Sequence, residues 1–156
     1  MPAAVVVASN RAAAGVYDDE TGPILVAFLR SLDFAVGDPV VVPDGPPVGE
    51  AIAAAVSDGA RVVLTTGGTG LTPTDRTPEQ TRALLDFEVP GIGEAIRAYG
   101  AAKGIPAAAL SRGIAGVIGR CLVVNLPGSR GGVKDGLKVL APILEHAIEQ
   151  VVGSDH

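Results

Sequence analysis

The sequence predicts an α/β fold: a three-layer α/β/α sandwich with a mostly parallel central sheet. Short runs of β-branched and apolar residues recur along the chain, and segments with helical spacing separate them. No run alternates polar with apolar residues, which is typical of strands covered by helices on both faces. The length of 156 residues and the hydrophobic content of 47% suit one folded unit, so residues 1–156 are predicted to form a single domain.

Four segments predict strands because each is short, apolar and rich in valine or other β-branched residues. They are residues 3–8, 40–42, 62–66 and 121–125. Helices are predicted between and after them. The first follows Pro23, where apolar side chains from Ile24 to Leu32 recur at helical spacing, and the second covers residues 48–58.

The next two helices are marked by proline near their starts. Thr77 is predicted to be an N-cap, with Pro78 in the first turn and Gln80 closing a capping box. A further helix follows Pro90 and extends to about Lys103.

The last predicted helix covers roughly residues 135–152 and has an apolar stripe at helical spacing. Pro142 lies inside it and lacks an amide hydrogen, so a bend or a loosened turn is expected there. Gly153 is a plausible end to the helix, and residues 154–156 are expected to fray.

Composition excludes several classes of function. The net charge of −5 disfavours nonspecific binding to duplex DNA, and 3% aromatic residues without tryptophan are too few for a base-stacking surface. No apolar run reaches the roughly 18 residues that a membrane span needs. The first residues lack a basic segment, which argues against a secretory signal and favours the cytoplasm. One cysteine, Cys121, allows neither an internal disulfide nor a cysteine zinc cluster, and its thiol is expected to be inert.

Each predicted strand is followed by a polar loop. The loops are residues 9–11, 43–46, 67–77 and 126–132. Parallel strands deliver such loops to one carboxyl edge of the sheet, which is where open α/β sheets bind ligands. This edge is the predicted site.

The sharpest signal in these loops is Gly67-Gly68-Thr69-Gly70, directly after a predicted strand. Glycines let backbone amides approach an anion closely, and a helix start nearby favours negative charge, so the segment predicts a phosphate cradle. It matches neither the P-loop nor the dinucleotide-binding pattern. The alternative is that the glycines only form a tight turn.

Two loop carboxylates could hold a hard cation beside this cradle. Asp75 precedes a predicted helix start, and a phosphorylated substrate in an acidic protein favours a Mg²⁺ held there. The helix dipole alone could also explain Asp75. Asp44 lies in Pro-Asp-Gly, which is itself a turn signature. Together the two form a possible metal or substrate clamp.

Other polar residues carry weaker signals. Five basic residues in or near the loops could offset phosphate charge or could be ordinary surface charge: Arg11, Arg76, Arg112, Arg130 and Lys134. Ser111 has no adjacent histidine or lysine in the sequence, so hydrogen bonding is expected rather than nucleophilic catalysis. His146 and His156 are not predicted to be catalytic or metal-binding residues.

The order of these motifs resembles the MogA/MoaB family of molybdenum cofactor biosynthesis proteins. The resemblance is carried by Thr66-Gly67-Gly68-Thr69-Gly70, Asp75, Thr77-Pro78-Glu79, a Pro-Gly-Ile-Gly segment, Leu-Ser-Arg and Asn125-Leu126-Pro127-Gly128. It covers nearly the whole chain. The resemblance implies a trimer and molybdopterin adenylyltransferase chemistry: ATP and Mg²⁺ adenylylate the terminal phosphate of molybdopterin and pyrophosphate is released.

The resemblance also implies roles for particular residues. Asp44 and Asp75 would be the essential carboxylates, Ser111 would match a pterin-site serine, and the segment Pro127-Gly128-Ser129 would match the Leu-Pro-Gly loop. The chain has Asn10 and Arg130 where family members often have aspartate and proline. Those departures bear on nucleotide or metal contacts at this edge.

Two alternatives to this enzyme follow from the same resemblance. One is a non-catalytic pterin-binding or scaffolding module that passes cofactor intermediates to a partner, such as a downstream molybdenum-insertion protein. The other is a related enzyme that acts on another nucleotide or pyrophosphate.

Overall fold

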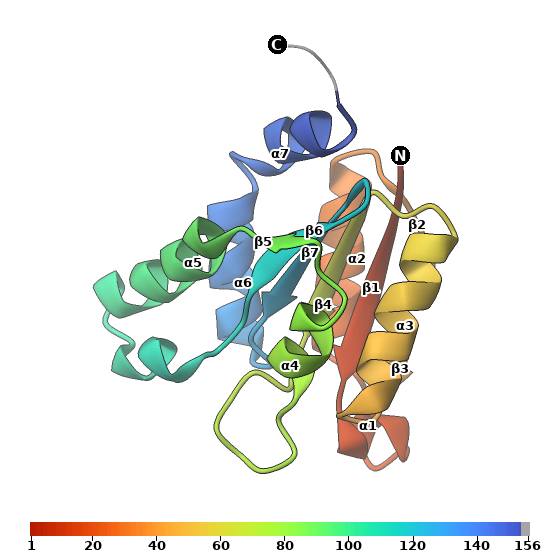
Figure 1. The fold of residues 1–156 in the computed structure, drawn as a ribbon. Coiled ribbons are helices and arrows are strands. Elements are labelled where there is room, and N and C mark those ends of the chain that lie inside the picture. The colour runs from red at the N-terminus through yellow and green to blue at the C-terminus, as the bar shows by residue number, and fades with distance from the viewer. Residues whose placement is uncertain (154–156) are drawn as a thin grey trace.

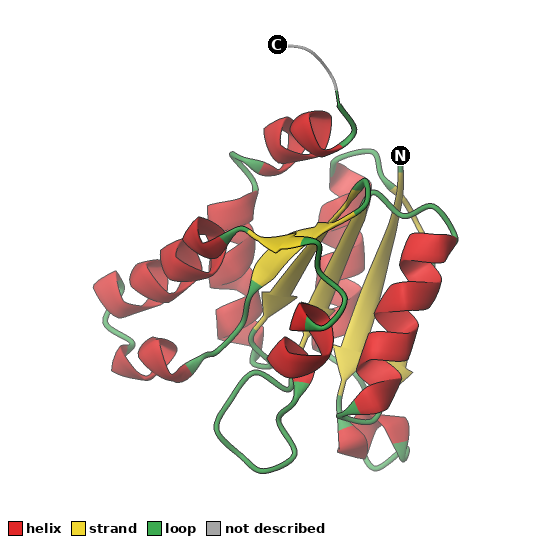
Figure 2. Cartoon of the chain, in the orientation of Figure 1, coloured by secondary structure: helices red, strands yellow, loops and turns green. Residues whose placement is uncertain are grey.

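A computed structural model describes residues 1–153 as a seven-stranded mixed sheet between two layers of helices (Figure 1, Figure 2). The strand order is β2-β1-β4-β7-β6-β5, and β3 also pairs with β1. The predicted three-layer α/β/α fold with a mostly parallel sheet is confirmed. The predicted fraying of residues 154–156 lies outside the described residues.

The strands are β1 (Pro2–Ala8), β2 (Ala35–Val36), β3 (Val40–Val42), β4 (Val62–Thr66), β5 (Phe87–Glu88), β6 (Ala115–Ile118) and β7 (Cys121–Leu126). The helices are α1 (Asn10–Ala13), α2 (Thr21–Ser31), α3 (Pro46–Ser57), α4 (Thr77–Arg82), α5 (Pro90–Ala102), the short 3₁₀ helix η1 (Pro106–Leu110), α6 (Arg130–Leu140) and α7 (Leu144–Val151). All four predicted strands are present, as β1, β3, β4 and β7.

Side chains that point to opposite faces of the sheet form two apolar cores. One core packs alternate residues of β1, β4 and β7 against α2, α5, α6 and α7. The other packs the intervening residues of the same strands against α3 and the segment that follows α4. This double burial is why the strand sequences are apolar throughout.

Three strands were not predicted. β2 and β5 have two residues each, which is too short for a pattern to show. β6 pairs antiparallel with β7 and contains Gly116, whose missing Cβ leaves room for Leu85 and for the carbonyl oxygen of Phe87. The antiparallel β5–β6 edge lies beyond β7, so it leaves the parallel strands that carry the site undisturbed.

The predicted capping box at α4 is wrong. Arg76 is the N-cap and makes no side-chain cap bond, while Thr77 is already helical. The Gln80 side chain instead lies against Gly49 of α3, where its Oε1 atom would be 2.7 Å from a Cβ on that glycine. Packing between α3 and α4 therefore overrides the local signal. α3 also begins at Pro46, two residues earlier than predicted.

The prediction of one continuous last helix is wrong. It is two helices, α6 and α7, with a break rather than a bend where Pro142 cannot donate a backbone hydrogen bond. α6 begins at Arg130 because the Ser129 side chain caps it, accepting a hydrogen bond from the Gly132 amide at 3.0 Å. Gly153 follows α7 with φ +88°, as a helix-ending glycine does.

Parallel pairing brings the predicted loops together. β1 pairs in parallel with β3 and β4, and β4 pairs in parallel with β7. The loops that follow these strands therefore leave one edge of the sheet, the lower edge in Figure 1, where the long loop between β4 and α4 projects. Among the described residues, none of the helices combines the length and the apolarity that crossing a membrane requires.

Candidate functional site

Three loops meet backbone to backbone at this edge. Gly67 has φ +91°, and a Cβ there would collide with the carbonyl oxygen of Ala8 at the end of β1. The Gly67 amide donates to the carbonyl oxygen of Leu126 at 3.2 Å, and a Cβ on Gly128 would lie 3.2 Å from the Gly67 Cα. Only glycine permits this approach at Gly67, so the glycine cluster has a structural role as well as any ligand role.

Gly68 opens a small space lined by two oxygen atoms. Its φ is +69°, and a Cβ there would collide with Thr77 Oγ1 and lie 2.8 Å from Asp44 Oδ1. Both oxygen atoms are buried and have no hydrogen-bond partner among the described residues. A buried polar atom left unpaired costs about 1–3 kcal/mol, so these two atoms are the strongest indication of a binding function at the edge.

Asp75 lies beside the same glycine segment. A Cβ on Gly70 would be 2.8 Å from Asp75 Oδ2, and this oxygen accepts a hydrogen bond from the Thr72 amide at 3.0 Å. Burial, and then the charge of Asp75, raise the pKa of Asp44 above its ordinary value. The structure thus brings Asp44 and Asp75 to the glycine segment from two different loops.

The donor atoms at this place fit a hard divalent cation. Carboxylate, hydroxyl and phosphate oxygens are the ligands that Mg²⁺ prefers, and a cation would relieve the repulsion between Asp44 and Asp75. No group of three or more histidine, cysteine, aspartate or glutamate side chains suited to a metal occurs within residues 1–153. A cation here would therefore depend on a phosphorylated substrate or water for its remaining ligands.

Arg112 fixes the loop that carries Asp75. Its backbone amide donates to the Thr69 carbonyl oxygen at 2.8 Å, and its guanidinium donates to the carbonyl oxygens of Gly70 at 2.9 Å and Asp75 at 3.1 Å. The same group holds both carboxylate oxygens of Glu79 on α4, at 2.7 and 3.2 Å. This pairing lowers the pKa of Glu79. The guanidinium is therefore committed to the protein, and Arg112 is not a free phosphate ligand.

The predicted first loop contacts Asp44 directly. Asn10 Oδ1 accepts a hydrogen bond from the Asp44 amide at 2.9 Å. An aspartate could accept the same bond, so the asparagine keeps the geometry while removing one negative charge near Asp44. The departure from the family pattern at Asn10 is thus compatible with this contact.

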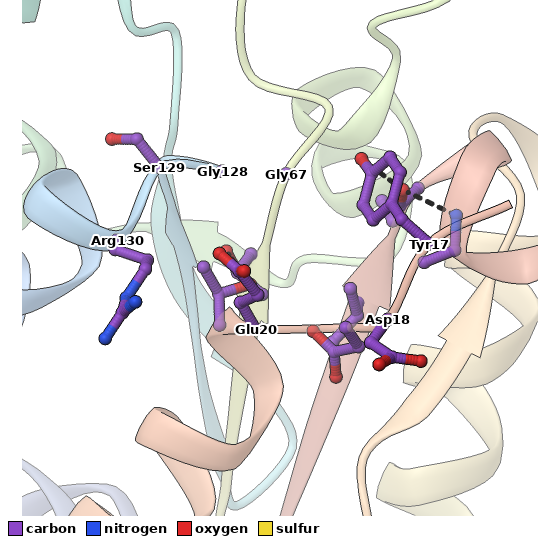
Figure 3. A pocket seen from close by; sticks show the side chains of 14 residues that line it. Tyr17, Asp18, Glu20, Gly67, Gly128, Ser129 and Arg130 are labelled. Carbon is purple, nitrogen blue, oxygen red and sulfur yellow. Dashed lines mark hydrogen bonds between the residues drawn. The ribbon is translucent and has the colours of Figure 1, made fainter.

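Two cavities flank the junction of the loops. The larger, of about 560 Å³, is bounded by the ends of β1 and β4, by residues 17–21 and by Gly128, Ser129 and Arg130 (Figure 3). The smaller, of about 240 Å³, lies among α5, η1 and the start of α6 and is lined by Ser111 and Pro127. Ser129 lines both cavities, whereas Asp44 and Asp75 line neither.

The remaining predicted residues divide between these places. Ser111 donates a hydrogen bond to Thr69 Oγ1 at 3.4 Å, which joins the glycine segment to the smaller cavity. Arg130 lines the larger cavity together with the acidic segment that includes Asp18 and Glu20. Cys121 is buried, and burial raises the pKa of its thiol to about 12, which is consistent with the predicted inert thiol.

Sequence reasoning missed Thr77 as a site residue. It treated the hydroxyl as a helix cap, whereas the hydroxyl faces Gly68 without a partner. The available signal was the position of Thr77 in the Thr-Pro-Glu segment, which is one of the motifs that carry the sequence resemblance. It also missed the acidic stretch Asp18, Asp19 and Glu20, which has no distinctive pattern in the sequence.

The chain is similar to proteins of molybdenum cofactor biosynthesis. A family described as "Probable molybdopterin binding domain" matches residues 4–146. A molybdopterin adenylyltransferase of Pyrococcus furiosus is 38% identical over 153 residues, covering 93% of this chain and 90% of that protein. The solved structure of the molybdopterin biosynthesis Mog protein from Mycobacterium ulcerans has a TM-score of 0.92 at 52% identity and covers 96% of this chain and 98% of that one.

Longer relatives also match. A molybdenum cofactor biosynthesis bifunctional protein of Synechococcus elongatus is 38% identical over 155 residues, which cover 99% of this chain and 48% of that protein. The chain thus spans about half the length of the bifunctional relatives it matches. The sequence resemblance stated above is confirmed by these matches. The chain belongs to the molybdopterin-binding domain family of molybdenum cofactor biosynthesis, with the MogA/MoaB fold.

Proposed function

We propose that this protein transfers AMP from ATP to the terminal phosphate of molybdopterin in a Mg²⁺-dependent reaction. The observation that supports it most is the pair of unpartnered buried oxygens, Asp44 Oδ1 and Thr77 Oγ1, beside the glycine segment and close to Asp75. Relatives that bear the name molybdopterin adenylyltransferase cover most of the chain, which supports the same activity.

The glycine segment and the two cavities have separate binding roles in this proposal. Backbone amides of Gly68, Thr69 and Gly70 bind phosphate oxygens of the nucleotide. The predicted Gly67 amide is not available for this role, because it already donates to the Leu126 carbonyl oxygen. Ser111 in the smaller cavity, with the segment Pro127-Gly128-Ser129 that leads to it, binds the pterin or its phosphate. The larger cavity beside Gly67 accommodates the rest of the nucleotide.

Asp44 and Asp75 are the residues that would hold Mg²⁺, directly or through water. The cation, when bound, supplies positive charge to the phosphate oxygens as the transition state forms. The two carboxylates orient that charge, and Arg112 keeps the Asp75 loop in place while they do so.

Adenylyl transfer needs little covalent chemistry from side chains. An oxygen of the molybdopterin phosphate attacks the α-phosphorus of ATP, the bond from this phosphorus to the bridging oxygen breaks, and pyrophosphate leaves with the electron pair. Positioning and charge neutralisation lower the barrier in phosphoryl-type transfers. We therefore propose no covalent enzyme intermediate and assign no nucleophile.

The proposal includes the setting that the resemblance implies. The protein is a homotrimer of the cytoplasm, its substrates are small molecules, and it hands adenylylated molybdopterin to a molybdenum-insertion protein. It binds neither nucleic acid nor membrane.

The test is incubation of the purified protein with molybdopterin, ATP and Mg²⁺, followed by assays for pyrophosphate and AMP-molybdopterin. We expect both products in equal amounts. Molybdopterin binding without either product would overturn the proposal in favour of the non-catalytic module. Pyrophosphate release that needs no molybdopterin would overturn it in favour of another nucleotide substrate.

A further inference from the structure

The smaller cavity contains a charged side chain that the proposed chemistry does not use. Asp135 of α6 lines the cavity, and only 4% of this residue is exposed to solvent. Among the described residues, Asp135 is the only buried residue with a charged side chain. The neighbouring wall is largely apolar, with Ile96, Ile105 and Ala108 among its residues. A carboxylate in such a wall requires a reason, because removing a charge from water is costly.

The ion pair of Asp135 does not supply that reason. Lys103 Nζ lies 2.8 Å from Asp135 Oδ1, but the Lys103 side chain is 49% exposed whereas that of Asp135 is 6% exposed. The lysine stays hydrated, so the pair resembles a surface salt bridge, which contributes little stability. An ionised carboxylate has about four acceptor positions, and this contact occupies one of them. An ion pair that only linked the end of α5 to α6 could form at the surface without burying the carboxylate.

We propose that Asp135 recognises the 2-amino and N3–H edge of the pterin ring of the substrate. This inference rests on the proposed function, in which the smaller cavity takes the pterin. The pterin edge presents two adjacent N–H donors, which match the two oxygens of a carboxylate as a guanidinium does. The corresponding edge of adenine presents one donor beside an acceptor. Asp135 therefore selects pterin over adenine in this cavity.

The rest of the cavity is consistent with that orientation. Its apolar residues suit the faces of a flat ring system. Arg97, the other charged residue of the wall, is already bound to the carbonyl oxygens of Ser111 at 3.3 Å and Gly113 at 2.8 Å, so it does not neutralise Asp135. Pro127 and Ser129 connect the cavity to the glycine loops. A pterin whose amino edge meets Asp135 can direct its phosphate-bearing side toward that junction.

The test compares two fluorescent probes that differ at this edge. 6-Hydroxymethylpterin has the 2-amino group, whereas 6-hydroxymethyllumazine has an oxygen in its place, which a carboxylate repels. Binding of each probe is measured by fluorescence titration without ATP, for the wild-type protein and for the variants Asp135→Asn and Lys103→Met. The ratio of the two affinities within one protein does not depend on the fraction folded.

We expect the wild type to prefer the pterin by about 10- to 100-fold. Asp135→Asn should reduce the preference to near unity, and Lys103→Met, which breaks the ion pair but keeps the carboxylate, should retain it. A wild-type ratio near one, or an Asp135→Asn ratio equal to that of the wild type, would overturn the proposal. The titration requires no turnover. Its result can therefore be interpreted even if the protein does not catalyse adenylyl transfer.

Discussion

Two polar clusters lie on either side of Thr77, and they differ in whether their atoms are paired. In the inner cluster, Asn125 donates to Thr65 Oγ1 at 2.9 Å and to Thr81 Oγ1 at 3.0 Å. Its Oδ1 atom accepts from the Ile114 amide at 3.2 Å. The Thr81 hydroxyl then donates to the Thr77 carbonyl oxygen at 2.8 Å. Every side chain here has a partner, and the network joins β4, β7, α4 and the entry to β6.

The outer cluster begins on the same residue. The Thr77 hydroxyl and Asp44 Oδ1 are equally buried but lack partners among the described residues, and the charge of Asp75 opposes ionisation of Asp44. The inner cluster is thus a completed structural network, and the outer cluster is one that a ligand would complete. Unpaired atoms, rather than polarity or burial alone, therefore distinguish the candidate site from the scaffold.

The largest expected effect is on the outer cluster. Asp75→Asn removes the charge of an exposed-loop carboxylate and leaves its shape. We expect adenylyl transfer to fall by about 100-fold or more, with little change in melting temperature, since electrostatic stabilisation of phosphate charge is the main catalytic term. AMP-molybdopterin formation and thermal unfolding are measured together. Asp38→Asn, an exposed aspartate away from the site, is the control; equal activity of the Asp75 variant and this control would remove Asp75 from the mechanism.

For the inner cluster we expect the opposite pattern, in which the substitution acts mainly on stability. Asn125→Ala leaves the Thr65 hydroxyl and the Ile114 amide without these partners and removes the donor to Thr81, which keeps its bond to the Thr77 carbonyl oxygen. We therefore expect a loss of about 3 kcal/mol in the free energy of unfolding. Denaturant unfolding measures it. Thr74→Ala, which removes an exposed hydroxyl, should change that free energy by less than about 0.5 kcal/mol. If Asn125→Ala were as stable as the wild type, the inner network would not be the scaffold described.

Arg112 couples a structural contact to the site, so its effect should be intermediate. In Arg112→Lys a single ammonium group replaces the planar guanidinium. It cannot reach Gly70, Asp75 and Glu79 together. We expect kcat to fall about tenfold and the Mg²⁺ concentration for half-maximal rate to rise, with a small change in stability. Arg82→Lys, at the surface pair with Glu88, is the matched control. Identical Mg²⁺ dependence in both variants would show that Arg112 does not position Asp75.

The smallest effect concerns pH and stability at Asp44. Because the pKa of Asp44 is raised in the folded state, the stability linked to its protonated form is complete below the unfolded pKa, near 4, and is lost as pH rises through the raised value. Asp44→Asn should therefore melt about 1–3 °C higher than the wild type at pH 7 without Mg²⁺. The gain should vanish below about pH 4. A variant that melts lower than the wild type at pH 7 would show that burial and the charge of Asp75 do not destabilise the ionised Asp44.

The sequence could predict the parallel core and the edge where the site lies, because β-branched runs and the carboxyl-edge rule act through local pattern and topology. The same pattern and topology predict that Asp44 and Asp75 lie at one edge of the sheet. It could not predict the unpartnered state of Thr77, which depends on how Gly68 approaches α4. It could not reveal that Arg112 is occupied by Glu79, 33 residues away in the chain. Partners distant in sequence leave no local signal.

The role proposed for Asp44 and Asp75 is cation binding at the outer cluster. Electron paramagnetic resonance can monitor the binding of Mn²⁺ together with a non-hydrolysable ATP analogue, and this measurement of cation binding requires no turnover. We expect the wild type to bind the Mn²⁺–nucleotide complex at least about tenfold more tightly than Asp44→Asn or Asp75→Asn, since each variant loses a charged oxygen ligand. Equal affinity in all three proteins would show that the two carboxylates do not hold the cation.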